Sequence, residues 1–185
     1  GTVWGDAGYL RGAKRNVVWN ASSDYDLVFP YVVADSIGGD LTSEEYTFGG
    51  GYGHRSGRYT WALEAGARAL HEYRDSDPRI RNVAIDIDAG AGASVRMGNH
   101  RLGLSAALRV YKQSGSQIQY AHSAGEKGVY HLSGLGSHYA GFEGNANSQT
   151  RYRGSGYGLT LALVPDAGRG GLHLAAGYEY LHIEK

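Results

Sequence analysis

Hydrophobic and polar residues alternate with a period of two along much of this chain. The clearest case is Val83–Met97, which reads VAIDIDAGAGASVRM, with apolar odd positions and small or charged even positions. Because successive side chains of a β-strand point to opposite faces, this pattern predicts one long strand with an apolar and a polar face. Globular strands run about 5–6 residues, whereas strands that cross a bilayer need roughly 9–11. A bilayer-spanning sheet is therefore the first hypothesis.

The remaining predicted strands follow the same alternation with varying clarity. Thr2–Lys14 alternates poorly, and Asp26–Ala34 is apolar on both faces and contains Pro30, which suits an edge strand. The pattern predicts eight strands, and Gly128–Leu135 would be a ninth. The clear ones are Glu45–Arg55, Arg58–Arg74, Val83–Met97, Leu102–Val110, Tyr157–Leu163 and Leu172–Tyr180. We therefore predict an all-β, antiparallel meander of about eight or nine long strands, forming over residues 1–185 a single β-barrel domain or a fragment of a larger barrel.

The predicted connections alternate between short and long. Ser56-Gly57, Gly98-Asn99-His100 and Asp166–Gly170 are rich in the residues that tight turns require. Between them lie longer polar segments, Arg74–Asn82 and a run from Lys112 to Gly154. Short turns at one end and long loops at the other are typical of outer-membrane barrels.

Two packings satisfy the alternation. The apolar rows face lipid in a membrane barrel, and they face a core in the alternative, a soluble β-sandwich or barrel. Lysine usage favours the membrane, because only four lysines occur, all at strand ends, in loops or at the terminus, and the polar face is mostly Gly, Ala, Ser and Thr with isolated Arg, Asp and Glu. Tyr59, Trp61 and Tyr73 flank an Ala/Leu centre, like the aromatic girdles of a lipid-facing wall.

Composition narrows the function classes. Lys+Arg and Asp+Glu number 18 each, so no charge excess favours nucleic acid, and the absence of cysteine excludes disulfides and thiolate metal sites. No run approaches the roughly 18 apolar residues of a membrane helix. The eight histidines show no metal-binding spacing, and the glycines of Gly49–Gly53 lack the Lys-Ser/Thr of a phosphate loop. We predict no catalytic, cofactor-binding or metal-binding residue, and no enzyme.

Several motifs resemble an uncharacterised family of Bacteroidales outer-membrane β-barrel proteins. They are Trp19-Asn20, Ser23-Asp24-Tyr25, Gly38-Gly39-Asp40, EEYTFGGGYG (Glu44–Gly53), Trp61 and YRDSDPRIRN (Tyr73–Asn82). The resemblance implies the outer membrane of a Gram-negative bacterium and a barrel with more strands than the pattern predicts. It brings no established activity, cofactor or catalytic residue.

The sequence differs from a complete barrel in two ways. It has no leader, and it ends in Ile183-Glu184-Lys185 without a terminal aromatic residue. We expect a segment of a longer protein with two strand edges that could pair with another chain. Whether it closes into a barrel or forms a curved open sheet stays open.

The candidate functional residues lie on the polar face and in the long loop. The polar-face set is Glu64, Arg68, Asp86, Asp88, Arg96 and Arg109. Asp86 and Asp88 could share a cation or position an acid and a base, or they form ion pairs with arginines across a lumen. The loop set is Tyr120, Tyr130, Tyr139 and Phe142, which either bind a glycan or protein or pack over the barrel mouth.

These observations lead to one prediction and one alternative. We predict an outer-membrane β-barrel protein with a pore-like, structural or surface-binding role, in contact with membrane lipid or detergent. The alternative is a soluble all-β binding module that recognises glycan or protein. The substrate, the pore size, the oligomeric state and the strand count of the parent barrel do not follow from the sequence.

Overall fold

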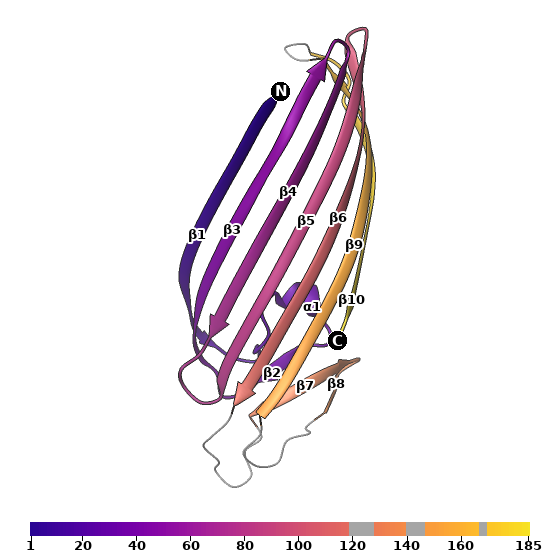
Figure 1. Ribbon diagram of the computed structural model, residues 1–185. Helices are drawn as coiled ribbons and strands as arrows, with labels where there is room; N and C mark the ends of the chain where they lie inside the picture. The colour runs from indigo at the N-terminus through magenta and orange to yellow at the C-terminus, as the bar shows by residue number, and fades with distance from the viewer. Residues whose placement is uncertain (119–127, 140–146, 167–169) are drawn as a thin grey trace.

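The computed structural model describes residues 1–118, 128–139, 147–166 and 170–185 of the chain. Its main body is a sheet of seven long antiparallel strands, in the order β1-β3-β4-β5-β6-β9-β10. Their bounds are β1 Thr2–Val17, β3 Gly39–Ser56, β4 Tyr59–Tyr73, β5 Arg79–Met97, β6 His100–Ile118, β9 Asn147–Pro165 and β10 Leu174–Glu184. The predicted all-β, antiparallel class is confirmed. Figure 1 shows the strands side by side as a curved wall.

The wall is open within the described residues. β1 pairs only with β3, β10 pairs only with β9, and no pairing joins β1 to β10 among these residues. Between these edges, neighbouring strands are paired residue by residue over most of their length, and a bulge interrupts the register only between Lys14 and Val17 of β1. Of the two arrangements that the sequence left open, the described residues form the curved open sheet.

The outward face of the wall carries the apolar rows. We call this surface the apolar band: every second residue of Val3–Tyr9, Tyr46–Tyr52, Tyr59–Ala69, Val83–Val95, Leu102–Val110, Tyr157–Leu163 and Leu174–Tyr180. Large side chains of the band are exposed, for example Leu104 at 59% and Leu108 at 64%. Within the described part of the chain these rows do not form the core that the soluble alternative required.

Beyond the band, at the end of the long connections, the outward positions become polar and the inward positions become buried. On β6 the inward Tyr111 and Gln113 are buried, whereas the outward Lys112 and Ser114 are exposed. The predicted loop from Lys112 to Gly154 is therefore wrong in extent, because β6 continues to Ile118 and β9 already begins at Asn147. The sequence pattern missed these extensions because the outward positions become polar there.

A second, small sheet lies at the same end of the wall (Figure 1). It pairs β2 (Val33–Asp35), β7 (Val129–Gly134) and β8 (Ser137–Tyr139) in the order β2-β7-β8. The predicted ninth strand therefore exists as β7, but outside the main sheet. The strand predicted over Asp26–Ala34 is wrong, since this stretch contains the end of the one-turn helix α1 (Tyr25–Val28) and the start of β2. It is apolar on both sides because Val28, Val32 and Val33 are buried inside the wall.

The connections at the opposite end are tight. Two-residue turns at Gly57-Arg58 and Gly98-Asn99 join β3 to β4 and β5 to β6. Gly57 and Gly98 adopt φ values of 59° and 63°, a left-handed conformation that glycine reaches without steric cost. Among the described residues, no helix has the length and apolarity needed to cross a membrane.

Candidate functional site

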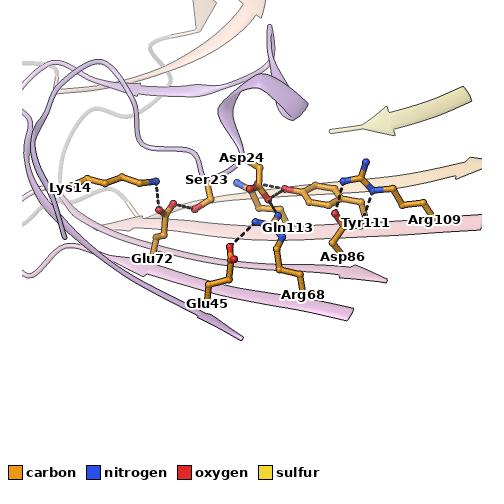
Figure 2. A network of polar contacts seen from close by, with 10 residues as sticks. All are labelled: Lys14, Ser23, Asp24, Glu45, Arg68, Glu72, Asp86, Arg109, Tyr111 and Gln113. Carbon is orange, nitrogen blue, oxygen red and sulfur yellow. Dashed lines mark hydrogen bonds and ion pairs between the residues drawn. The ribbon is translucent and has the colours of Figure 1, made fainter. Parts of the chain in front are cut away.

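The concave face of the wall holds a piece of the chain between β1 and β3, residues 18–38, which we call the inner segment. It contains α1 and β2 and folds back on itself, with Trp19 N–H and Ala21 N–H donating to the carbonyl groups of Asp35 and Val33 at 2.6 and 2.8 Å. Figure 2 shows polar side chains of the wall converging on this segment. The contacts come from β4, β5, β6 and β9, so the inner segment is fastened across four adjacent strands.

Asp24 is the centre of the contacts on β4 and β6. Its Oδ2 lies 2.5 Å from Nη2 of Arg68 and accepts a hydrogen bond from the Tyr111 hydroxyl at 2.9 Å. Arg68 also donates to Glu45 Oε2 of β3 at 3.2 Å. Asp24 has φ 47° and ψ 48°, a left-handed conformation that Asp tolerates better than most residues. The Asp24 carboxylate thus fixes the start of α1 to the wall (Figure 2).

Glu72 makes a second attachment closer to the end of the wall. Its carboxylate is buried and accepts hydrogen bonds from the Ser23 hydroxyl and from Lys14 Nζ of β1, the latter at 2.5 Å. The Gln113 amide meets Ser23 from β6: with its nitrogen turned toward the Ser23 carbonyl, it donates at 2.9 Å. A buried carboxylate must be paired, and here two side chains from different segments supply the partners.

A buried ion pair holds the end of the inner segment. The side chains of Asp35 and Arg74 are both fully inaccessible to solvent and are paired through Oδ2 and Nη1. Asp35 also accepts the N–H groups of Ile37 and Gly38 at 2.9 and 3.1 Å, and Arg74 donates to the Val17 carbonyl at 3.1 Å. The pair therefore joins both ends of the inner segment to the β4–β5 connection.

Apolar packing fills the space between these attachments. One cluster places Val28 and Val32 of the inner segment against Leu70, Ala84, Tyr111 and Tyr152 of the wall. A second cluster joins Ala21, Val33, Leu41 and Ile80. The Tyr152 hydroxyl of β9 donates to the Tyr31 carbonyl at 2.6 Å, and Asn82 of β5 donates to the Ala21 carbonyl at 2.8 Å. The core of the protein is thus inside the curve of the wall.

The predicted polar-face residues all point inward, but they do not form one site. Asp86 is held by Arg109 through Nε at 2.9 Å and Nη2 at 2.5 Å. Arg96 lies at the opposite end, 3.5 Å from Asp166. Glu64 and Asp88 are exposed and lie over glycines of the neighbouring strands, and the pocket that Asp88 lines together with Arg109 does not include Glu64.

Glycines on the inner face make room for long side chains of the adjacent strand. A Cβ on each of these glycines would lie between 2.5 and 3.1 Å from the neighbouring side chain. The pairs are Trp4 over Gly51, Asp6 over Gly49, Thr47 over Gly8, Glu64 over Gly90, Asp88 over Gly66, Asn82 over Gly115 and Thr160 over Gly177. On the inner face, long side chains therefore lie flat against the glycines of the neighbouring strand.

The predicted loop aromatics are only partly described. Tyr120 and Phe142 lie outside the described residues, and Tyr139 ends β8. Tyr130 belongs to β7, where its ring lies 6.0 Å from that of Trp19 and 5.3 Å from that of His138, centroid to centroid. Tyr130 therefore helps to pack the small sheet onto the inner segment. Next to it, burial lowers the pKa of His131, and the Lys185 ammonium acts in the same direction.

The residues that make this site were missed at the sequence level, apart from Arg68, Asp86 and Arg109. Asp24, Glu72, Tyr111 and Arg74 each contact a residue far away in the chain, and such contacts leave no local pattern. One usable signal is that Arg68 and Glu72 share the polar side of the same predicted strand. No group of acidic, histidine or cysteine side chains suited to a metal ion occurs in the described ranges.

These observations define the class of the protein: an antiparallel β-wall with an exposed apolar outward face and a segment of its own chain fastened to its polar inward face. The chain belongs to a family of unknown function (DUF6850), whose model matches residues 1–185. No curated protein and no solved structure matches it.

Proposed function

We propose that this chain forms part of the bilayer-spanning wall of an outer-membrane β-barrel, and that its inner segment plugs the lumen at the end of the long connections. In this role it is a structural, pore-lining component with no catalytic chemistry. The observation that carries the proposal is the apolar band, whose leucines, isoleucines and aromatic residues are exposed on the convex face. Monomeric soluble proteins rarely expose contiguous apolar surface beyond a few hundred Å².

The shape of the apolar band supports a bilayer. On β6 it runs from Leu102 to Val110, close to the roughly 9–11 residues that a tilted membrane strand needs. Its limit shifts from strand to strand: the first outward charge is Glu44 on β3, Lys112 on β6 and Arg153 on β9. Lys112 and Arg153 are paired with each other, in the same row of the sheet as Ile85. Glu44 is in the row of Val83, which is two residues, or one outward step, farther along β5 from the middle of the band. On β5 the first outward charge is Arg81, which is level with Thr42 and one step beyond Glu44, so the limit of the band steps back between β5 and β6.

Aromatic side chains mark both limits of the band on the first strands. The rings of Tyr9 and Tyr46 contact each other in a tilted arrangement with centroids 4.9 Å apart at one limit, and those of Tyr52 and Trp61 lie 5.3 Å apart near the other. Tyrosine and tryptophan concentrate at the two membrane–water interfaces, where the ring is apolar and its polar atom reaches water.

The edges of the wall add a requirement to the proposal. Unpaired N–H and C=O groups are costly in hydrocarbon, so an open sheet edge is not stable at membrane depth. The proposal therefore includes further strands, of the same or another chain, that pair with β1 and β10. The plug is proposed because the inward side chains of the wall are polar, as in a lumen, and several of them bind the inner segment.

Neighbouring residues of β6 provide the test, because the chain has no cysteine and single substitutions give unique labels. Leu104 faces outward and Ser105 faces inward. Leu104→Cys and Ser105→Cys are spin-labelled in the full-length protein in outer-membrane vesicles, and collisions with oxygen and with a water-soluble nickel chelate are measured. We expect the Leu104 label to collide much more often with oxygen than with the nickel chelate, and we expect this ratio to be lower for the Ser105 label. Equal access of the nickel chelate to both labels would contradict the proposal.

A further inference from the structure

Cationic side chains gather on the outward face immediately beyond the apolar band, at the end of the long connections. We call Arg81 of β5, Lys112 of β6, and Arg151 and Arg153 of β9 the basic patch. All four are exposed and lie on three adjacent strands. Each occupies the outward row of its strand, in line with the apolar residues: Arg81 follows Val83, and Lys112 follows Val110. The patch is therefore continuous with the surface that the proposed function places in lipid.

Two members of the patch face each other without a neutralising partner. Lys112 and Arg153 are directly paired across β6 and β9. Like charges in this position destabilise a sheet unless an anion lies between them. Within the described residues, Lys112, Arg151 and Arg153 make no ion pair. Glu184 is the residue paired with Arg153 across β9 and β10, but its carboxylate lies 3.3 Å from His182 instead. By contrast, Arg11 at the same end of β1 is balanced by Glu44 at 3.7 Å.

Nearby tyrosines indicate where the basic patch lies relative to the lipid headgroups. Tyr157 of β9 lies two outward steps from Arg153 toward the middle of the band, and its ring is 5.6 Å from that of Tyr180, centroid to centroid. Tyrosine rings favour the level of lipid headgroups. Long cationic side chains placed just beyond them reach the phosphate groups of the same lipids.

The opposite limit of the band lacks such charges. At the tight-turn end, the outward strand positions of the described residues are His54, Ser56, Tyr59, Met97, His100 and Pro165. The arginines of that end that the structure describes point inward or lie in a turn, as Arg101 does toward Asp166 at 3.0 Å and Arg58 does beside Tyr59. The asymmetry therefore distinguishes one leaflet from the other.

We infer that the basic patch binds the phosphate groups of anionic lipid headgroups in the leaflet on the side of the long connections. This inference rests on the proposed function, since it needs the band to lie in a bilayer. The guanidinium group of arginine donates two parallel hydrogen bonds to phosphate, and lysine adds a point charge. A phosphate between Lys112 and Arg153 also removes the repulsion between these two side chains.

The test compares the full-length protein with Lys112→Gln/Arg153→Gln and with the control Arg58→Gln, which removes a cation at the opposite end. Each is titrated in detergent with phosphatidic acid or phosphatidylcholine, and bound lipid is counted by native mass spectrometry. We expect the double variant to bind phosphatidic acid roughly 30-fold more weakly, because each cation near an anionic surface contributes about 1 kcal/mol. Arg58→Gln and the binding of phosphatidylcholine should not change.

Two outcomes overturn the inference separately from the proposed function. If the Leu104 label is in lipid but the double variant binds phosphatidic acid as the parent does, only the inference fails. If inorganic phosphate at the same ionic strength displaces the lipid, the patch is a general anion site and not a headgroup site. If the Leu104 label contacts water, both proposals fail.

Discussion

At the scale of single residues, the most constrained pair is Asp35 with Arg74. Both side chains are sealed from solvent, and each has further backbone partners, so neither charge is left without compensation. Such a pair adds little stability over an apolar pair of the same size, but removing one partner leaves a buried charge. Its effect is to fix where the inner segment begins and ends.

Replacing one member of this pair should therefore destabilise the fold strongly. We expect Asp35→Asn to lower the free energy of unfolding by about 3–5 kcal/mol, because the Arg74 guanidinium stays buried without its counter-charge. Asp26→Asn, an exposed change in the same segment, should lie within about 0.5 kcal/mol of the parent. Denaturant unfolding measures both. A double change, Asp35→Leu with Arg74→Met, should recover much of the loss, and failure to do so would contradict this explanation.

At the scale of elements, the alternation of apolar and polar residues predicted those strands that have one apolar outward face and one polar inward face. Val83–Met97 covers all of β5 except its first four residues, and Arg58–Arg74 exceeds β4 by one residue at each end, because one face is exposed apolar surface and the other is lined with polar groups. In the stretch Asp26–Ala34 the valines are buried inside the wall whereas Phe29 and Tyr31 are exposed, so its apolar residues follow no period of two and suggested a strand where a helical turn lies.

The site was predictable to a smaller degree than the strands. Arg68, Asp86 and Arg109 were expected inside because they share the polar side of their strands. Their partners were not, since Asp24 reaches Arg68 across 44 positions of the chain and Tyr111 across 87. Which polar residue meets which depends on the path of the inner segment, and that path is set by long-range packing.

Loosening the inner segment should open the lumen if it acts as a plug. Asp24→Ala removes the contacts to Arg68 and Tyr111, and each lost hydrogen bond in a buried site costs about 1–3 kcal/mol. We expect a higher single-channel conductance, or more frequent open events, for the full-length protein in planar bilayers. Asp26→Ala is the matched control from the same turn. Unchanged conductance together with faster amide exchange in residues 18–38 would exclude the plugging role.

At the scale of the whole molecule, the wall separates three surroundings. The apolar band faces outward, the polar and glycine-rich rows face inward, and the extended strand ends beyond the band are polar outside and buried inside. The change of the outward row from apolar to polar along a single strand, as on β6 from Leu108 to Lys112, is what a bilayer of limited thickness would impose.

A depth series tests this three-part arrangement. Ala91→Arg lies near the middle of the apolar band on β5, and Val83→Arg lies at its limit, both on the outward face. In lipid vesicles we expect Ala91→Arg to cost about 2–4 kcal/mol of unfolding free energy and Val83→Arg about 0–1 kcal/mol. On a surface in contact with water, both changes would be mild and similar. Equal costs at the two depths would therefore argue against a bilayer.

The glycines of the inner wall have a consequence for how this protein can change over time. Asp88 occupies the volume above Gly66, and Glu64 occupies the volume above Gly90. A methyl group at either glycine would lie 2.7 Å from the Asp88 carboxylate or 3.0 Å from the Glu64 carboxylate, so the side chain beside it would have to move. We therefore expect each glycine and the carboxylate that lies over it to change together in evolution, and not independently.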